Sequence, residues 1–95
     1  MQFQASLGMD KIKQSWKLYI LECGDGSLYT GITLDIERRL TEHQSGKGAK
    51  YTRGRAPLRL VYSEVCGTKS AALLREMAVK KMSRAGKMGL YKTFL

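Results

Sequence analysis

The sequence predicts a single small α+β domain in which helices pack on a mainly antiparallel β-sheet. Three short segments rich in aliphatic and aromatic residues, each bounded by turn residues, predict strands at 16–23, 27–32 and 58–65. Helical periodicity follows the second and the third strand, so the expected order is β-β-α-β-α. A chain of 95 residues buries roughly 60 to 65% of its unfolded surface, which is enough for one thin core and excludes a second domain.

Residues 1–15 show no sustained period and are expected to be a loose leader before a single domain at 16–95. Met9 is a candidate for the natural start, because patterned sequence begins near Trp16. The N-terminus lacks the continuous apolar core of a secretion signal, and no run reaches the ~18 apolar residues of a membrane span. We therefore expect a cytoplasmic protein without a membrane partner.

The first expected helix covers 34–44, between the second and third strands. Thr33 is its expected N-cap, Asp35 and Glu37 lie in its first turn, and Gly46 lies just past its end. These signals fix both ends of the helix.

The second expected helix follows the third strand. It runs from a Thr68 cap to about Arg84, and Gly86 is its expected terminator. The tail 87–95 is expected to add a short helical turn. The apolar residues expected to form the buried stripe of this helix are Leu74, Ala78 and Met82.

The charge balance indicates the kind of partner. Seventeen Lys and Arg residues against eight Asp and Glu residues give a net charge of +9. In so small a protein this excess favours a polyanion such as nucleic acid. Two cysteines, Cys23 and Cys66, have no second pair at metal-binding spacing, so they predict reduced structural thiols and give no support to a zinc site.

The turn between the first two strands decides whether Tyr19 and Tyr29 lie on one face of the sheet. Side chains alternate along a strand, so a two-residue turn separates the tyrosines and a three-residue loop brings them together. We favour the three-residue loop 24–26, because Gly26 then occupies the position where a G1 bulge requires positive φ. The tyrosines then share a face with Gly31, whose missing side chain leaves room for a ligand to approach.

Five segments follow one another at characteristic spacing between Trp16 and Arg84. They read LYI, YTG, ITLDIERRL, TEHQSGKGAKYTRGRAPLRLVYSE and ALLRE. In this order they resemble the GIY-YIG nuclease superfamily, and in particular its small stand-alone bacterial branch. Leu18 and Thr30 replace the letters that are usual in the two tripeptides of the family.

The resemblance implies a three-stranded antiparallel sheet flanked by helices, with metal-dependent phosphodiester hydrolysis on the sheet face. Gly31 follows the second motif tyrosine and belongs to the implied substrate-binding surface, and Glu76 corresponds to the ligand of Mg²⁺ or Mn²⁺. Since Mg²⁺ takes one or two carboxylates together with waters and substrate phosphates, the ion is expected to bind mainly with nucleic acid. The implied catalytic residues are Tyr19, Tyr29, Arg39, His43 and Glu76.

Simpler roles are open to the same residues. Asp35 and Arg39 are four residues apart, as are Glu76 and Lys80, so both pairs could be surface ion pairs worth about 0.3–0.5 kcal/mol. His43 lies near the end of a helix, where it could interact with the helix dipole.

The segment 45–55, a basic loop, is the densest basic region. Its glycines allow a nucleic-acid backbone to approach, its cations contact phosphates without reading sequence, and Tyr51 could stack on a base. A solvated basic loop is the alternative. The residues expected to bind substrate here are Lys47, Lys50, Tyr51, Thr52, Arg53 and Arg55.

These features together predict a metal-dependent endonuclease that acts on DNA in branched, damaged or single-stranded form. The chain contains no asparagine, whereas relatives usually carry one after the metal-binding helix, so Lys87, Tyr91 or no residue takes its place. One alternative is a non-catalytic nucleic-acid-binding module. Another is an accessory subunit of a larger nuclease, which would dock a protein partner through the tail 86–95.

Overall fold

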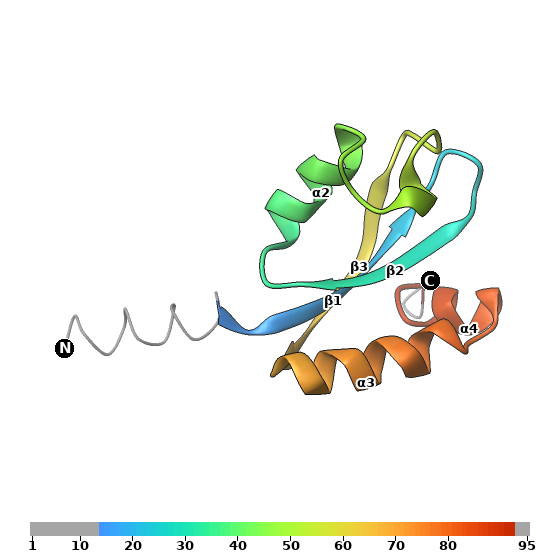
Figure 1. Ribbon diagram of the computed structural model, residues 1–95. Coiled ribbons are helices and arrows are strands. Elements are labelled where there is room, and N and C mark those ends of the chain that lie inside the picture. Colours follow the sequence, from blue (N-terminus) through green and yellow to red (C-terminus); the bar gives the residue numbers. More distant parts are fainter. Residues whose placement is uncertain (1–13, 93–95) are drawn as a thin grey trace.

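The computed structural model describes residues 14–92 and has the expected α+β architecture (Figure 1). The expected leader falls outside the described residues except for its last two positions, as do the Met9 start and the last three residues of the tail. Among the described residues, no helix is long and apolar enough to cross a membrane. The elements are β1 (Trp16–Glu22), β2 (Leu28–Thr33), α2 (Ile36–Gln44), the 3-10 helix η1 (Lys50–Thr52), β3 (Arg59–Gly67), α3 (Lys69–Lys80) and α4 (Arg84–Gly89).

The sheet is antiparallel and has the order β2-β1-β3, so β1 is central and β2 forms an edge. Tyr19 pairs with Gly31 across the β1–β2 hairpin. At the turn, the Cys23 amide donates to the Ser27 carbonyl at 2.9 Å, and Gly26 has a φ of 84°. The prediction of a three-residue loop is therefore confirmed.

Helices cover both faces of the sheet. Figure 1 shows α2 and η1 on one side and α3 and α4 on the other. Leu18 and Ile20 of β1 and Val79 of α3 are fully buried and form the core between the sheet and α3. The opposite face of β1 carries Tyr19, which is only 2% exposed because α2 lies over it.

The first helix begins two residues later than the sequence predicts. Asp35, and not Thr33, is the N-cap, and its Oδ1 accepts a hydrogen bond from the Arg38 amide at 3.1 Å. Thr33 ends β2, and its hydroxyl accepts from the Asp35 amide at 3.1 Å. The threonine thus stabilises the turn between strand and helix, which leaves the cap to the aspartate.

The Thr68 cap of α3 is confirmed, since its Oγ1 accepts from the Ala71 amide at 3.1 Å. The expected end is wrong: α3 stops at Lys80, and Gly86 lies inside α4 behind a Ser83 cap. The expected buried stripe is wrong at Leu74, which is 69% exposed, and at Ala78, which is also exposed, whereas Met82 packs against the core as expected.

The reason is that polar residues occupy the inward face of α3. Ala72 and Val79 are buried, and Arg75 and Glu76 lie between them on the same face, half-buried. Arg75 binds Glu64 of β3, with Nε 2.9 Å from Oε2. A search for apolar periodicity therefore selects the wrong side of this helix.

Thr30 offers a test of packing on β2. Its side chain is buried, and its Oγ1 has no hydrogen-bond partner among the described residues. A buried hydroxyl without a partner costs about 1–3 kcal/mol, so Thr30→Val should raise the free energy of unfolding by about 1 kcal/mol. Thr52→Val is the opposite control, because the Thr52 hydroxyl is buried with partners and its loss should destabilise. Urea unfolding measures both, and a less stable Thr30→Val variant would contradict the assignment.

Candidate active site

Tyr19 and Tyr29 meet on one face of the hairpin, with ring centroids 6.2 Å apart. His43 of α2 packs edge-on against both rings, at centroid distances of 5.8 Å and 5.3 Å. Gly31 permits this arrangement, because a Cβ at that position would lie 2.5 Å from the phenol oxygen of Tyr19. The space at Gly31 that the sequence assigns to a ligand is thus taken by Tyr19.

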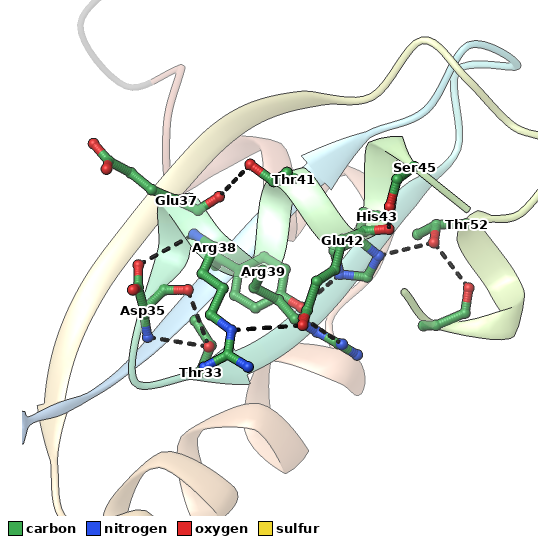
Figure 2. A network of polar contacts seen from close by, with 12 residues as sticks. Thr33, Asp35, Glu37, Arg38, Arg39, Thr41, Glu42, His43, Ser45 and Thr52 are labelled. Carbon is green, nitrogen blue, oxygen red and sulfur yellow. Dashed lines mark hydrogen bonds and ion pairs between the residues drawn. The ribbon is translucent and has the colours of Figure 1, made fainter. Parts of the chain in front are cut away.

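A chain of hydrogen bonds runs from Tyr19 through the buried His43 into the basic loop (Figure 2). Tyr19 Oη lies 2.9 Å from His43 Nε2, and His43 Nδ1 lies 2.8 Å from Thr52 Oγ1. Thr52 donates its own proton to the Ala49 carbonyl at 2.9 Å, so it accepts from Nδ1–H of the histidine. The Thr52 contact thus places a proton on Nδ1 of His43, and in the neutral ring Nε2 accepts the proton of the Tyr19 hydroxyl.

Arg39 is one helical turn before His43 and approaches the same phenol. Its guanidinium lies near enough to Tyr19 to lower the pKa of that phenol, and its Nη1 lies 3.1 Å from Glu42 Oε1. Burial raises the pKa of Tyr19 to about 12, although Arg39 acts in the opposite direction. Tyr19 is thus protonated at neutral pH, and the Arg39 side chain, which is 32% exposed, connects it to the surface.

His43 is the single histidine of the chain, so its titration can be followed without assignment. Burial, and then the charge of Arg39, lower its pKa from the ordinary 6.5. The unfolded chain therefore binds the imidazole proton more readily than the folded chain does. The neutral His43 thus contributes to the free energy of unfolding above pH 6.5, and this contribution is lost as pH falls through the folded-state pKa. Imidazole proton NMR should give a pKa below 6.5, and a higher value would contradict the neutral tautomer.

Glu76 lies on the inward face of α3, and its side chain is 18% exposed. Its Oε2 is 3.4 Å from Lys80 Nζ, and Lys80 lines a cavity of about 460 Å³ together with Tyr29 and Tyr51. Among the described residues, no hydrogen bond or ion pair joins Glu76 to Tyr19. Lys80 links Glu76 to the lining of that cavity, but α3 packs on the side of the sheet opposite α2, so Glu76 does not contact the Tyr19 hydrogen-bond chain.

The cluster of two tyrosines, an arginine and a histidine corresponds to a known domain. The sequence profile of the GIY-YIG catalytic domain matches residues 15–90. The chain belongs to the GIY-YIG family. Membership of this family implies a nuclease-like activity and nucleic acid as the class of ligand.

Other small GIY-YIG proteins are similar to this chain over most of their length. A UPF0213 protein of Cupriavidus pinatubonensis is 53% identical over 81% of this chain and 86% of its own. A UPF0213 protein of Haloquadratum walsbyi is 56% identical over 77% of this chain and 82% of its own. Because the aligned segments span most of these short proteins, they confirm that the chain belongs with the small stand-alone branch of the family.

Two solution NMR structures have a similar fold. The UPF0213 protein from Bacillus halodurans has a TM-score of 0.52 at 53% identity, and it covers 80% of this chain and 81% of its own. A protein from E. faecalis has a TM-score of 0.60 at 49% identity, with 84% and 85% covered. The fold of the GIY-YIG domain is thus supported by two solved relatives.

The basic loop of this GIY-YIG domain is fixed to the hairpin turn. The Arg55 side chain pairs with Asp25, and the backbone carbonyl of Arg55 accepts a hydrogen bond from the Gly24 amide at 2.6 Å. The Arg55 guanidinium lies 4.3 Å from the centroid of the Tyr51 ring, and Tyr51 stacks on Tyr29 at 5.9 Å. The remaining expected cations of the loop are exposed, namely Lys47, Lys50 and Arg53.

Thr52 has a different role from the one that the sequence predicts. It is 2% exposed and holds His43, so it does not face solvent where substrate would bind. Gly48 makes the contact possible, because a Cβ there would lie 2.3 Å from His43 Nδ1. The sequence carries no signal for this contact, because it depends on how η1 folds back on α2.

The metal requirement of the family can be compared with the donor groups. The described residues contain no group of three or more His, Cys, Asp or Glu side chains that could hold a metal ion. A single carboxylate such as that of Glu76 is a suitable oxygen ligand for Mg²⁺ or Mn²⁺, with waters and substrate phosphate oxygens completing the coordination. A metal held in this way would be fully coordinated only when nucleic acid is bound.

Proposed function

We propose that this chain is a divalent-metal-dependent endonuclease that hydrolyses phosphodiester bonds of DNA. The observation that carries the proposal is the Tyr19 phenol, which lies 2.9 Å from Nε2 of His43 and next to the Arg39 guanidinium. One partner offers positive charge for a phosphate, and the other offers a proton acceptor.

Tyr19 would act through this pair of contacts. With a pKa of about 12 it is costly to ionise alone, so we assign it a proton relay. As a water oxygen bonds to phosphorus, the water proton passes to Tyr19 Oη and the phenol proton passes to His43 Nε2. The P–O bond to the leaving sugar oxygen breaks, and that oxygen keeps the electron pair and takes a proton from solvent. Thr52 stabilises the resulting imidazolium by accepting from Nδ1–H.

Arg39 and Glu76 would handle the charge of the phosphate. The exposed part of the Arg39 side chain can donate to non-bridging phosphate oxygens, which become more negative as water attacks. Glu76 would hold Mg²⁺ or Mn²⁺, which when bound supplies charge neutralisation at the phosphate and the leaving oxygen. Exposed cations of the basic loop, with the net charge of +9, would bind the nucleic-acid backbone on either side of the cut.

The test is cleavage of end-labelled DNA and RNA, each as single strand, duplex, flap and branch, in Mg²⁺, Mn²⁺ or EDTA. We expect cutting of DNA that requires the metal. Salt-sensitive binding without cutting of any substrate would contradict the proposal and favour a binding module. Weak binding, with cutting restored by a co-purified protein, would favour an accessory subunit.

A further inference from the structure

The cavity between Tyr29 and Lys80 has the composition of a nucleotide site. It measures about 460 Å³, within the range of small-ligand sites, and it lies along the edge strand β2. Figure 1 shows β2 between the side of the sheet that carries η1 and the side that carries α3 and α4. The lining residues are Leu28, Tyr29, Thr30, Tyr51, Lys80 and Lys87.

One wall of the cavity is aromatic and is held in place before any ligand binds. The Tyr29 and Tyr51 rings stack at 5.9 Å with an interplanar angle of 27°. Arg55 lies over Tyr51 and is paired with Asp25, whose pKa is lowered to about 2 mainly by hydrogen bonds from Ser27. An ordered aromatic surface binds a flat ring at low entropic cost.

The other walls offer polar groups and positive charge. Hydrogen-bonded and open pairs alternate along the hairpin, and Cys23 and Ser27 are a bonded pair, so the backbone groups of Leu28 and Thr30 point outward from the edge. They can donate to and accept from the edge of a base. Lys80 and Lys87 place ammonium groups at the same cavity, where a phosphate would be neutralised.

We propose that this cavity binds one unpaired nucleotide of the substrate beside the scissile bond, with its base against Tyr29 and Tyr51. A base within a duplex has both faces stacked, so it cannot enter the cavity without leaving the helix. Tyr29 also contacts His43, at 5.3 Å between centroids, so the bound nucleotide is adjacent to the catalytic residues. This inference rests on the proposed function. The substrate class is then nucleic acid that is single-stranded where it is cut.

Binding in EDTA tests the site without cleavage. Fluorescence anisotropy would compare one labelled DNA sequence as a single strand and as a duplex, with wild type, Tyr51→Ala and Tyr51→Phe. Loss of a stacked base weakens affinity by about 5- to 150-fold, so Tyr51→Ala should lose this much for the single strand and less than about twofold for the duplex. Tyr51→Phe keeps the ring and should bind as wild type. Equal losses for both DNA forms would overturn the inference.

Photocrosslinking locates the base. Single-stranded DNA with 5-iodouracil at one position should crosslink to Tyr29 or Tyr51, as identified by peptide mass spectrometry, and the matched duplex should not. Crosslinks confined to other residues would overturn the inference. Cleavage of single strand and duplex at equal rates, unaffected by Tyr51→Ala, would overturn it and leave the nuclease function standing. Crosslinking to these tyrosines without cleavage of any substrate would support the nucleotide site and contradict the nuclease function.

Discussion

Replacement of Glu76 by glutamine is expected to reduce metal-dependent cleavage by about 10³-fold. Glu76 is the carboxylate assigned to the metal, and a bound ion contributes several kcal/mol to stabilising a phosphoryl-transfer transition state. The amide keeps the size of the side chain and removes its charge. Single-turnover cleavage of the best substrate, with Mg²⁺ at increasing concentration, measures the loss.

Two controls separate this effect from damage to the fold. The Glu76–Lys80 pair is partly exposed, at 18% and 54%, so its loss should change the free energy of unfolding by less than about 1 kcal/mol. Glu37→Gln removes the same charge from an exposed position in the first turn of α2 and should leave cleavage near wild type. Cleavage by Glu76→Gln within about tenfold of wild type would contradict its assignment as the metal ligand.

Replacement of Tyr19 by phenylalanine is expected to have the second largest effect. The variant keeps the ring beneath α2 and removes the oxygen that hydrogen-bonds His43 and lies next to Arg39. A positioned proton-transfer group contributes about 10²–10⁴-fold to a rate, so cleavage should fall by that range. Because Nε2 of the buried His43 then lacks its donor, the free energy of unfolding should also fall by about 1–3 kcal/mol.

Tyr62→Phe is the matched control for that variant. Tyr62 lies on the core side of the sheet, and its hydroxyl donates to Glu64 Oε1 at 2.6 Å. Its removal also deletes a tyrosine hydrogen bond, but away from the proposed catalytic residues. We expect lower stability with unchanged cleavage for Tyr62→Phe, and equal loss of cleavage in both variants would argue that Tyr19 acts only through stability.

The sequence predicts the hairpin site well because its geometry is local. Parity and one glycine with positive φ decide that Tyr19 and Tyr29 share a face, and the structure agrees. The helix spacing of Arg39 and His43 is local as well. The proposed roles of these residues rest on family resemblance, because spacing alone fits surface ion pairs and helix-dipole contacts equally well.

The misplaced predictions concern contacts between elements that are distant in sequence. The prediction of the buried face of α3 misses because the inward face carries Arg75, which forms an ion pair with β3. Periodicity within the helix does not reveal this pair. Thr52 is assigned to substrate binding by the sequence, but η1 folds back against α2 and buries the Thr52 hydroxyl on His43. The space above Gly31, which the sequence leaves open for a ligand, holds the Tyr19 phenol.

The central claim is that a metal ion on Glu76 and the Tyr19, Arg39 and His43 cluster act on the same phosphate. Paramagnetic broadening by Mn²⁺ tests it most directly, in ¹⁵N NMR spectra of the full chain with single-stranded DNA carrying phosphorothioate linkages that slow cleavage. We predict DNA-dependent broadening of the amide signals of Glu76 and of residues 29–31. Broadening that spares either set, or that does not depend on DNA, would contradict the claim.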